Sequence, residues 1–139
     1  MPSFVAQRDE RSAPFFDAAE RNILLLKRCP RCEKWFEPDW RTCDDGTETD
    51  WRESSGHGAL VTWTVDHTTV LDPIFATTDG TRTLIGMVEL DEGPWLQTAI
   101  IDTDPESLVA GADMYVRFVR PSGGEPIPVF SNRSILGTD

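Results

Sequence analysis

The sequence predicts a mostly β protein in which a short N-terminal helix and a small cysteine-containing segment precede a five-stranded barrel. The chain has 139 residues, enough for one small domain or two very small ones. All three cysteines lie between positions 29 and 43, and runs of β-branched and aromatic residues follow position 56. We therefore divide the chain into a tail and helix over residues 1–26, a cysteine segment over 27–54 and a barrel over 55–139.

The first predicted element is an amphipathic helix from Pro14 to Leu26. Its apolar residues recur at intervals of three to four positions, which places them on one helical face. They are Phe15, Phe16, Ala19, Ile23 and Leu26. Pro14 suits the first turn of a helix, because the N–H that proline lacks would have no helical partner there.

The second half of the chain has the pattern of a small antiparallel barrel. The predicted strands are Leu60–Val65, Thr83–Leu90, Trp95–Asp102, Met114–Val119 and Ile127–Phe130. Turn residues from Asp91 to Pro94 favour a hairpin between the second and third strands. Asp104 and Pro105 predict a helical turn between the third and fourth strands. This arrangement is typical of the Greek-key barrel known as the OB-fold.

Charge and hydropathy exclude several classes of partner. The chain has 13 basic and 24 acidic residues, and its net charge of -11 repels phosphate backbones and anionic lipid surfaces. Its longest apolar run, Ile23–Leu26, is far shorter than the ~20 residues of a membrane span. An odd number of closely spaced cysteines suits a reducing compartment. We expect a cytoplasmic protein that binds neither nucleic acid nor membranes.

The cysteines predict one structural zinc ion. Cys29 and Cys32 form a two-thiol knuckle, and Cys43 follows ten residues later, so three ligands of a tetrahedral zinc site are present. The usual fourth ligand would stand three residues after Cys43. That position is Gly46, which has no side chain to offer.

The missing fourth thiolate leaves several alternatives open. A carboxylate of Asp44 or Asp45, or a water molecule, would complete the metal site. Alternatively, the segment binds no metal and is held by the packing of its tryptophans. A redox role is disfavoured, because Pro38 and the charged residues around it leave no helix after the Cys-x-x-Cys motif.

Several short motifs, in their order along the chain, carry a family resemblance. They are Phe15-Phe16-Asp17-Ala18-Ala19, the run from Leu25 to Cys32, Gly56-His57-Gly58, Thr62-Trp63-Thr64-Val65, the run from Val88 to Gly93, and Pro128-Val129-Phe130. The chain resembles the small OB-fold proteins with a rubredoxin-like zinc ribbon that accompany thiolase-type enzymes. The resemblance covers nearly the whole sequence.

This resemblance implies a non-catalytic accessory subunit of a thiolase-like enzyme. Family members help to form the acyl-CoA site of their partner, and some complexes catalyse acyl transfer or retro-aldol cleavage such as steroid side-chain removal. The catalytic groups would then belong to the partner. Accordingly, neither His57 nor His67 has a sequence neighbour that suggests nucleophilic catalysis. The alternative is a stand-alone OB-fold module that binds nucleic acid or a small ligand.

Aromatic residues predict where a partner would bind. Trp35, Phe36 and Trp40 lie in a segment with too few aliphatic residues to bury them all. Phe75 lies in the long link from His67 to Thr81, and long loops often carry binding residues. Because aromatic anchors commonly dominate interfaces, we expect these four residues to contact the partner.

Overall fold

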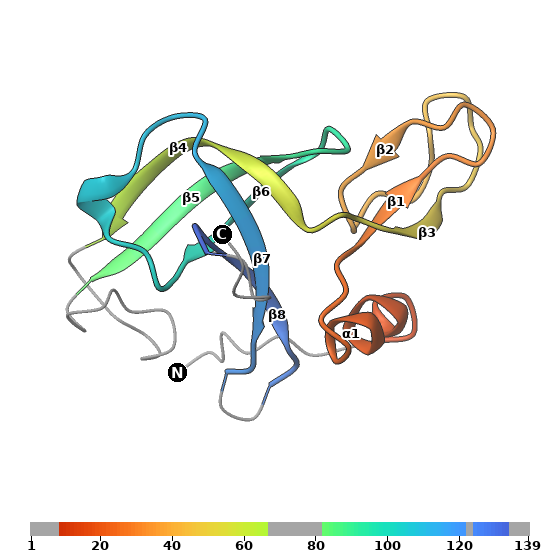
Figure 1. Cartoon of the computed structure of the whole chain (residues 1–139). Coiled ribbons are helices and arrows are strands. Elements are labelled where there is room, and N and C mark those ends of the chain that lie inside the picture. Colours follow the sequence, from red (N-terminus) through yellow and green to blue (C-terminus); the bar gives the residue numbers. More distant parts are fainter. Residues whose placement is uncertain (1–8, 67–81, 122–123, 134–139) are drawn as a thin grey trace.

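The computed structural model describes residues 9–66, 82–121 and 124–133 of the chain. Its elements are α1 (Ala13–Ala19), β1 (Leu25–Arg28), β2 (Trp35–Phe36), β3 (Asp50–Glu53), β4 (His57–Asp66), β5 (Thr83–Leu90), β6 (Trp95–Ile100), the 3-10 turn η2 (Pro105–Ser107), β7 (Asp113–Val119) and β8 (Ile127–Ser131). In Figure 1 the small sheet and α1 lie on one side of the molecule and the barrel on the other.

The barrel is closed and has the strand order β4-β5-β6-β8-β7. β4 pairs antiparallel with both β5 and β7, which closes the sheet on itself. β6 and β8 pair in parallel, with Ile100 opposite Phe130. The expected five-stranded barrel is thus confirmed, together with its hairpin from β5 to β6 and its helical turn, where the Asp104 side chain accepts a hydrogen bond from the Glu106 N–H. The expectation that all strands are antiparallel is wrong for β6 and β8, because the connection through η2 and β7 returns β8 in the direction of β6.

A second, three-stranded sheet has the order β2-β1-β3. Both outer strands pair antiparallel with β1, which places Lys27 opposite Phe36 on one side and Trp51 on the other. The Lys27 ammonium lies 4.1 Å from the centre of the Trp51 ring, within the range of a cation–π contact. We call residues 25–53 the ribbon.

The N-terminal helix is shorter than the sequence pattern predicts. It ends at Ala19, and Asn22 adopts a positive φ of 62° that turns the chain away from the helical path. Leu24 and Leu26 are both buried, and their spacing of two residues is that of a strand, so the expected continuation to Leu26 is wrong. A four-residue apolar run fits either periodicity, and here the pairing of β1 with β3 decides it.

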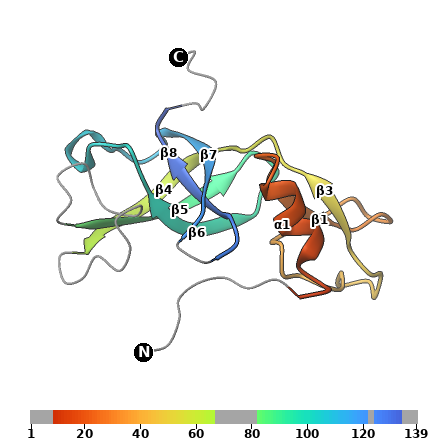
Figure 2. The same cartoon turned by 90° about the horizontal axis from the view of Figure 1, so that it is seen from below.

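The main hydrophobic core lies inside the barrel and extends to α1 and β1. Its buried members are Leu24, Leu26, Leu60, Leu84, Val88, Leu90, Ile100, Leu108, Met114 and Phe130. α1 contacts both β1 and β8, and it lies near both strands in Figures 1 and 2. An ion pair joins Glu20 to Arg120. Leu26 of β1 and the partly buried Trp35 of β2 therefore pack the ribbon against the barrel core.

No helix in the described part of the chain is long and apolar enough to cross a membrane. The α-helix that the structure does describe, α1, has seven residues.

Candidate functional site

Two tight turns of the ribbon bring the cysteines together. In the first turn, the Cys29 N–H donates to the Lys34 carbonyl at 2.9 Å, and the Glu33 N–H donates to the Cys29 carbonyl at 2.9 Å. Glu33 has a φ of 68°, and Arg28 holds its carboxylate at 2.8 Å. The Cys32 N–H points at the Cys29 sulfur at 3.4 Å. This turn therefore directs Cys29 and Cys32 to the same side.

The second turn carries the third cysteine. The Cys43 N–H donates to the Thr47 carbonyl at 2.8 Å, and the Gly46 N–H donates to the Cys43 carbonyl at 2.9 Å. Gly46 has a φ of 87°, a backbone conformation that favours glycine. An isolated β-bridge between Thr42 and Glu48 closes the base of the turn. The turn thereby presents Cys43 to the first knuckle.

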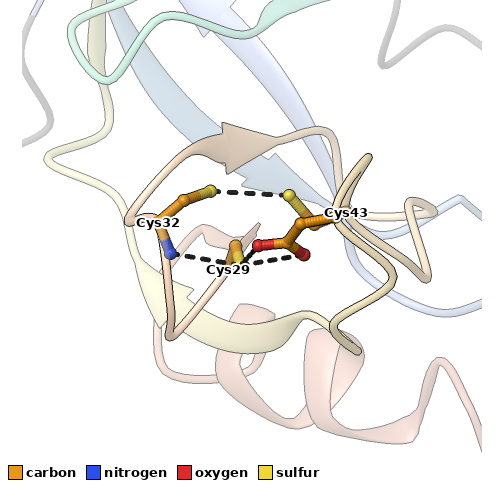
Figure 3. A group of neighbouring side chains, drawn as sticks. Cys29, Cys32 and Cys43 are labelled. Carbon is orange, nitrogen blue, oxygen red and sulfur yellow. Dashed lines mark hydrogen bonds between the residues drawn. The ribbon is translucent and has the colours of Figure 1, made fainter.

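The three thiols and one carboxylate form a compact cluster. The donor atoms of Cys29, Cys32, Cys43 and Asp45 all lie within 4.8 Å of one another. Figure 3 shows the three cysteine side chains directed toward a shared space. The Cys32 and Cys43 sulfurs are 3.4 Å apart, and an Asp45 oxygen lies 3.8 Å from the Cys29 sulfur. All three cysteines are free thiols.

The dimensions of this cluster fit a tetrahedral zinc ion. Zinc binds thiolate sulfur at about 2.3 Å and carboxylate oxygen at about 2.0 Å, so neighbouring donors in a tetrahedron lie roughly 3.5–3.8 Å apart. The Cys32–Cys43 distance of 3.4 Å and the Cys29–Asp45 distance of 3.8 Å lie within a few tenths of an ångström of that spacing. Of the two carboxylates expected as alternatives, the structure brings Asp45 into the cluster, whereas Asp44 lies 3.3 Å from the Lys34 ammonium.

Hydrogen bonds shift the proton affinity of the cluster. The Cys32 N–H lowers the pKa of the Cys29 thiol, and the Thr47 N–H lowers the pKa of the Asp45 carboxyl. The Asp45 N–H lowers the pKa of Cys43, but burial and the hydrogen bonds with the neighbouring side chains outweigh it and raise that pKa to about 11. Because metal ligation needs thiolates, an ion bound here would displace the Cys43 proton.

The aromatic residues of the ribbon differ in exposure. Phe36 is buried, with 5% of its surface exposed, whereas Trp40 stacks on it at 5.4 Å and keeps 43% of its surface exposed. Trp35 is half-buried against the barrel core. Phe75 falls outside the described residues. Trp40 is thus the ring that the ribbon offers most openly to another molecule.

An open groove of about 590 Å³ runs between the ribbon and the turn that joins β5 to β6. Its lining residues are Lys34, Trp35, Phe36, Glu37, Trp40, Asp44, Glu92, Gly93 and Pro94. Trp95 follows directly after Pro94 and is 49% exposed. Trp40 also lines a second hollow of about 560 Å³ between the ribbon and the first turn of α1. Trp40 therefore lies at the border of both hollows.

His57 has a carboxylate beside each of its two ring nitrogens. The sequence analysis did not predict these two contacts. Its Nδ1 lies 2.9 Å from an Asp91 oxygen, its Nε2 lies 2.9 Å from an Asp113 oxygen, and its ring centroid is 5.1 Å from that of Tyr115. Burial lowers the pKa of His57, but the hydrogen bonds to Asp113 and Asp91 outweigh it and raise the pKa above 6.5. No local sequence signal could reveal partners 34 and 56 positions away. His67 falls outside the described residues.

The linker between ribbon and barrel is held by the same turn. The Glu92 carboxylate accepts hydrogen bonds from the Ser54 hydroxyl at 2.8 Å and the Ser55 N–H at 2.7 Å. The Ser55 hydroxyl donates to Asp91 at 3.1 Å. These bonds fix residues 54–57 against the β5–β6 turn, so the groove has a defined wall on each side.

Comparison with known sequences finds a match to the central part of the chain. A family model described as the ChsH2 C-terminal OB-fold domain matches residues 51–119. A protein from Thermomonospora curvata named "Probable enoyl-CoA hydratase alpha subunit" is 26% identical over 121 residues. The match covers 86% of this chain and 36% of that protein, so the chain spans about a third of the length of this relative.

Comparison with solved structures finds the same architecture. A chain of the structure titled Ltp2-ChsH2(DUF35) aldolase superposes with a TM-score of 0.74 at 24% identity, and the match covers 91% of this chain and 97% of that chain. A DUF35-family protein of unknown function from Sulfolobus solfataricus superposes with a TM-score of 0.52 at 13% identity, covering 80% and 78%. At these identities the likeness concerns the fold.

Proposed function

Since residues 51–119, which contain β4 to β7 of the barrel, match the family of ChsH2 C-terminal OB-fold domains, we propose that the chain is an accessory subunit of a thiolase-like enzyme that acts on acyl-CoA. The observation that carries the proposal is the match over nearly the full length of a chain in the Ltp2-ChsH2(DUF35) aldolase. The name of the Thermomonospora relative, an enoyl-CoA hydratase subunit, supports an acyl-CoA substrate.

In this proposal the partner contributes the catalytic groups, and this chain helps to form the acyl-CoA site. The reaction would be acyl transfer or retro-aldol cleavage, with steroid side-chain removal as one case. The environment of His57 supports this division, because carboxylates already engage both of its ring nitrogens. We place the complex in the cytoplasm, where free thiols such as those of the ribbon persist.

We assign partner binding to the groove between the ribbon and the β5–β6 turn. Trp40 lines this groove with a largely exposed ring, and exposed aromatic rings at a recess are typical interface anchors. Trp95, which follows the lining residue Pro94 in the chain, exposes a second ring. Phe36 supports Trp40 from below through the stacked contact. Trp35 lines the groove and also packs against the barrel core. Phe75, which lies outside the described residues, stays a predicted partner contact.

We also propose that Cys29, Cys32 and Cys43 hold one structural zinc ion. When bound, zinc would cross-link the two turns of the ribbon through its ligand bonds. The three cysteines would fix the Lys34–Trp40 segment, which carries the exposed ring, between those turns. The role of the cluster is then to shape the docking surface.

The proposed function is tested by turnover of the thiolase-like partner with and without this chain. We expect the two proteins to co-purify, and we expect the partner to cleave or transfer its acyl-CoA substrate at least tenfold faster in the complex. The isolated chain should turn over no acyl-CoA. Equal partner turnover in the absence of this chain would refute the accessory role, and oligonucleotide binding would favour the stand-alone module instead.

The docking surface is tested by replacing one ring on it. Trp40→Ala should weaken the complex by about 2 kcal/mol or more, as the loss of a central anchor does. Val109→Ala is the matched control, because Val109 is 62% exposed and lies on the barrel away from the lining of the groove. Isothermal calorimetry measures both, and denaturant unfolding of the free chain checks that Trp40→Ala leaves the fold intact. Equal partner affinity of the two variants would show that Trp40 is not part of the interface.

A further inference from the structure

We infer that Asp45 is the fourth metal ligand, so that the ribbon is a three-thiolate, one-carboxylate zinc site. The inference rests on the structural zinc of the proposed function and adds the residue that completes it. It follows from three observations: the orientation of the Asp45 carboxylate, the engagement of Asp44 elsewhere and the backbone conformation at Gly46.

The turn itself orients the Asp45 carboxylate. One of its oxygens accepts a hydrogen bond from the Thr47 N–H at 2.9 Å. The other oxygen lies 3.8 Å from the Cys29 sulfur, which is close to the donor spacing of a tetrahedral zinc site. The side chain therefore already directs an oxygen toward the Cys29 sulfur, and the hydrogen bond from the Thr47 N–H would hold the carboxylate in that orientation.

The neighbouring residues are disposed differently. Asp44 is highly exposed and forms an ion pair with Lys34. At Gly46 a Cβ atom would meet nothing within 4 Å, so space is available for a side chain. The φ of 87° nevertheless makes any side chain there strained. The turn thus supplies its ligand from position 45, one residue before the position expected from cysteine spacing.

Replacing a thiolate by a carboxylate preserves the charge of the site and changes its softness. Three thiolates and one carboxylate carry four negative charges, the same as four thiolates. Oxygen is a harder donor than sulfur, so the site favours zinc over softer thiophilic ions more than a four-thiolate site would. The chemistry of Asp45 is therefore distinguishable from that of a fourth cysteine by metal preference.

The test compares Asp45→Asn with Asp44→Asn in the full chain. Both changes keep the side-chain shape and remove one negative charge, so the Asp44 variant controls for the loss of charge near the site. Zinc affinity is measured by competition with a chromophoric chelator. We expect Asp45→Asn to weaken zinc binding about tenfold or more, the scale of effect seen when groups around a metal are removed. Asp44→Asn should change the affinity less than about twofold.

A spectroscopic readout separates ligation from general stability. In the Co²⁺-loaded protein, the d–d absorption bands report the donor set around the ion. We expect these bands to shift in Asp45→Asn while the thiolate-to-cobalt charge-transfer bands persist, and we expect the spectrum of Asp44→Asn to match that of the wild type. Unchanged bands and unchanged affinity in both variants would refute Asp45 as a ligand.

The outcomes also distinguish this inference from the proposed structural zinc. If the wild-type chain binds no zinc, both proposals fail. If the wild type binds zinc and the two Asn variants lose affinity equally, the structural zinc stands and the assignment of Asp45 is wrong. As a further check, Gly46→Cys restores the usual four-cysteine spacing, and we expect it to bind zinc no more tightly than the wild type because of the strained backbone.

Discussion

The barrel and the ribbon bury their interiors in different ways. Ten buried residues, among them Leu84, Val88 and Phe130, form the cluster of the barrel and its flanking segments. The separate buried cluster of the ribbon consists of Cys29, Phe36 and Cys43, so two of its three members are thiols. Burial of apolar surface stabilises the first cluster, whereas the second has too little of it to hold two turns in place. We therefore expect the ribbon to depend on the thiol and carboxylate groups of its cluster more than the barrel does.

The largest expected effect lies in the barrel. Phe130→Ala removes a fully buried ring from β8, next to the parallel pairing with β6. We expect the free energy of unfolding to fall by about 3–5 kcal/mol, the usual cost of such a cavity. Urea unfolding with and without excess zinc measures the loss. A much smaller loss in zinc would mean that metal also stabilises the barrel, which would break the contrast between the two regions.

The second barrel prediction concerns a close approach of two strands. A Cβ atom at Gly58 in β4 would lie 2.5 Å from the Glu89 carbonyl oxygen of β5. Because a backbone atom cannot move aside cheaply, we expect Gly58→Ala to lower the free energy of unfolding by about 1–3 kcal/mol. A matched change at Gly93, where a Cβ would meet nothing within 4 Å, tests the positive φ of 118° without the clash. The Gly93 variant thus gives the cost of a positive φ alone, and an unfolding free energy of Gly58→Ala equal to that of the wild type would contradict the clash between the strands.

The ribbon should respond more weakly in global stability. Phe36→Ala removes the apolar member of the ribbon cluster. Since a region with few buried contacts can open without unfolding the rest, we expect the barrel to lose less than about 1 kcal/mol. The amide signals of β5, followed during urea unfolding, measure this. A loss as large as that of Phe130→Ala would show that the Cys29, Phe36 and Cys43 cluster unfolds together with the barrel.

The smallest expected effect is pH-dependent and lies at the junction. The pKa of His57 is raised in the folded chain, because the hydrogen bonds to Asp113 and Asp91 outweigh its burial. The stabilisation that protonated His57 provides is thus fully present at pH values below about 6.5, the pKa of a histidine in the unfolded chain. It is lost as the pH rises through the higher pKa of His57 in the folded chain. For so exposed a site we expect less than about 1 kcal/mol.

A His57→Gln variant isolates this contribution. The difference in unfolding free energy between wild type and variant should be larger at pH 6 than at pH 8.5. Subtracting the variant removes the pH dependence of groups other than His57. A difference that stays constant over this range would mean that the two carboxylates do not favour the charged ring.

The fold was largely predictable because its signals are local. The predicted strand Thr83–Leu90 has the bounds of β5, because the sequence has apolar residues at the alternating positions that are buried along the strand. The start of β4 at His57 was not predictable, because Gly56-His57-Gly58 has low strand propensity and pairing with β7 imposes the extended backbone. The end of α1 was missed because the run Ile23–Leu26 fits both periodicities.

The candidate site was predictable in its residue types and less so in its geometry. The spacing of Cys29, Cys32 and Cys43 predicts a metal site, and the structure brings the three side chains together. Sequence could not choose between Asp44 and Asp45, because the choice depends on the hydrogen bond to Thr47 and on the backbone at Gly46. The difference in exposure between Phe36 and Trp40 likewise arises from tertiary packing.

Hydrogen exchange of the zinc-loaded and chelator-treated chain tests most directly whether the ribbon and the barrel are held by different means. We predict that metal removal accelerates exchange of the Cys29, Glu33, Cys43 and Gly46 amides, which hydrogen-bond within the two turns, by about tenfold or more. The paired amides of β5 and β8 should keep their protection. Uniform acceleration across both regions, or unchanged exchange in the ribbon, would contradict the account.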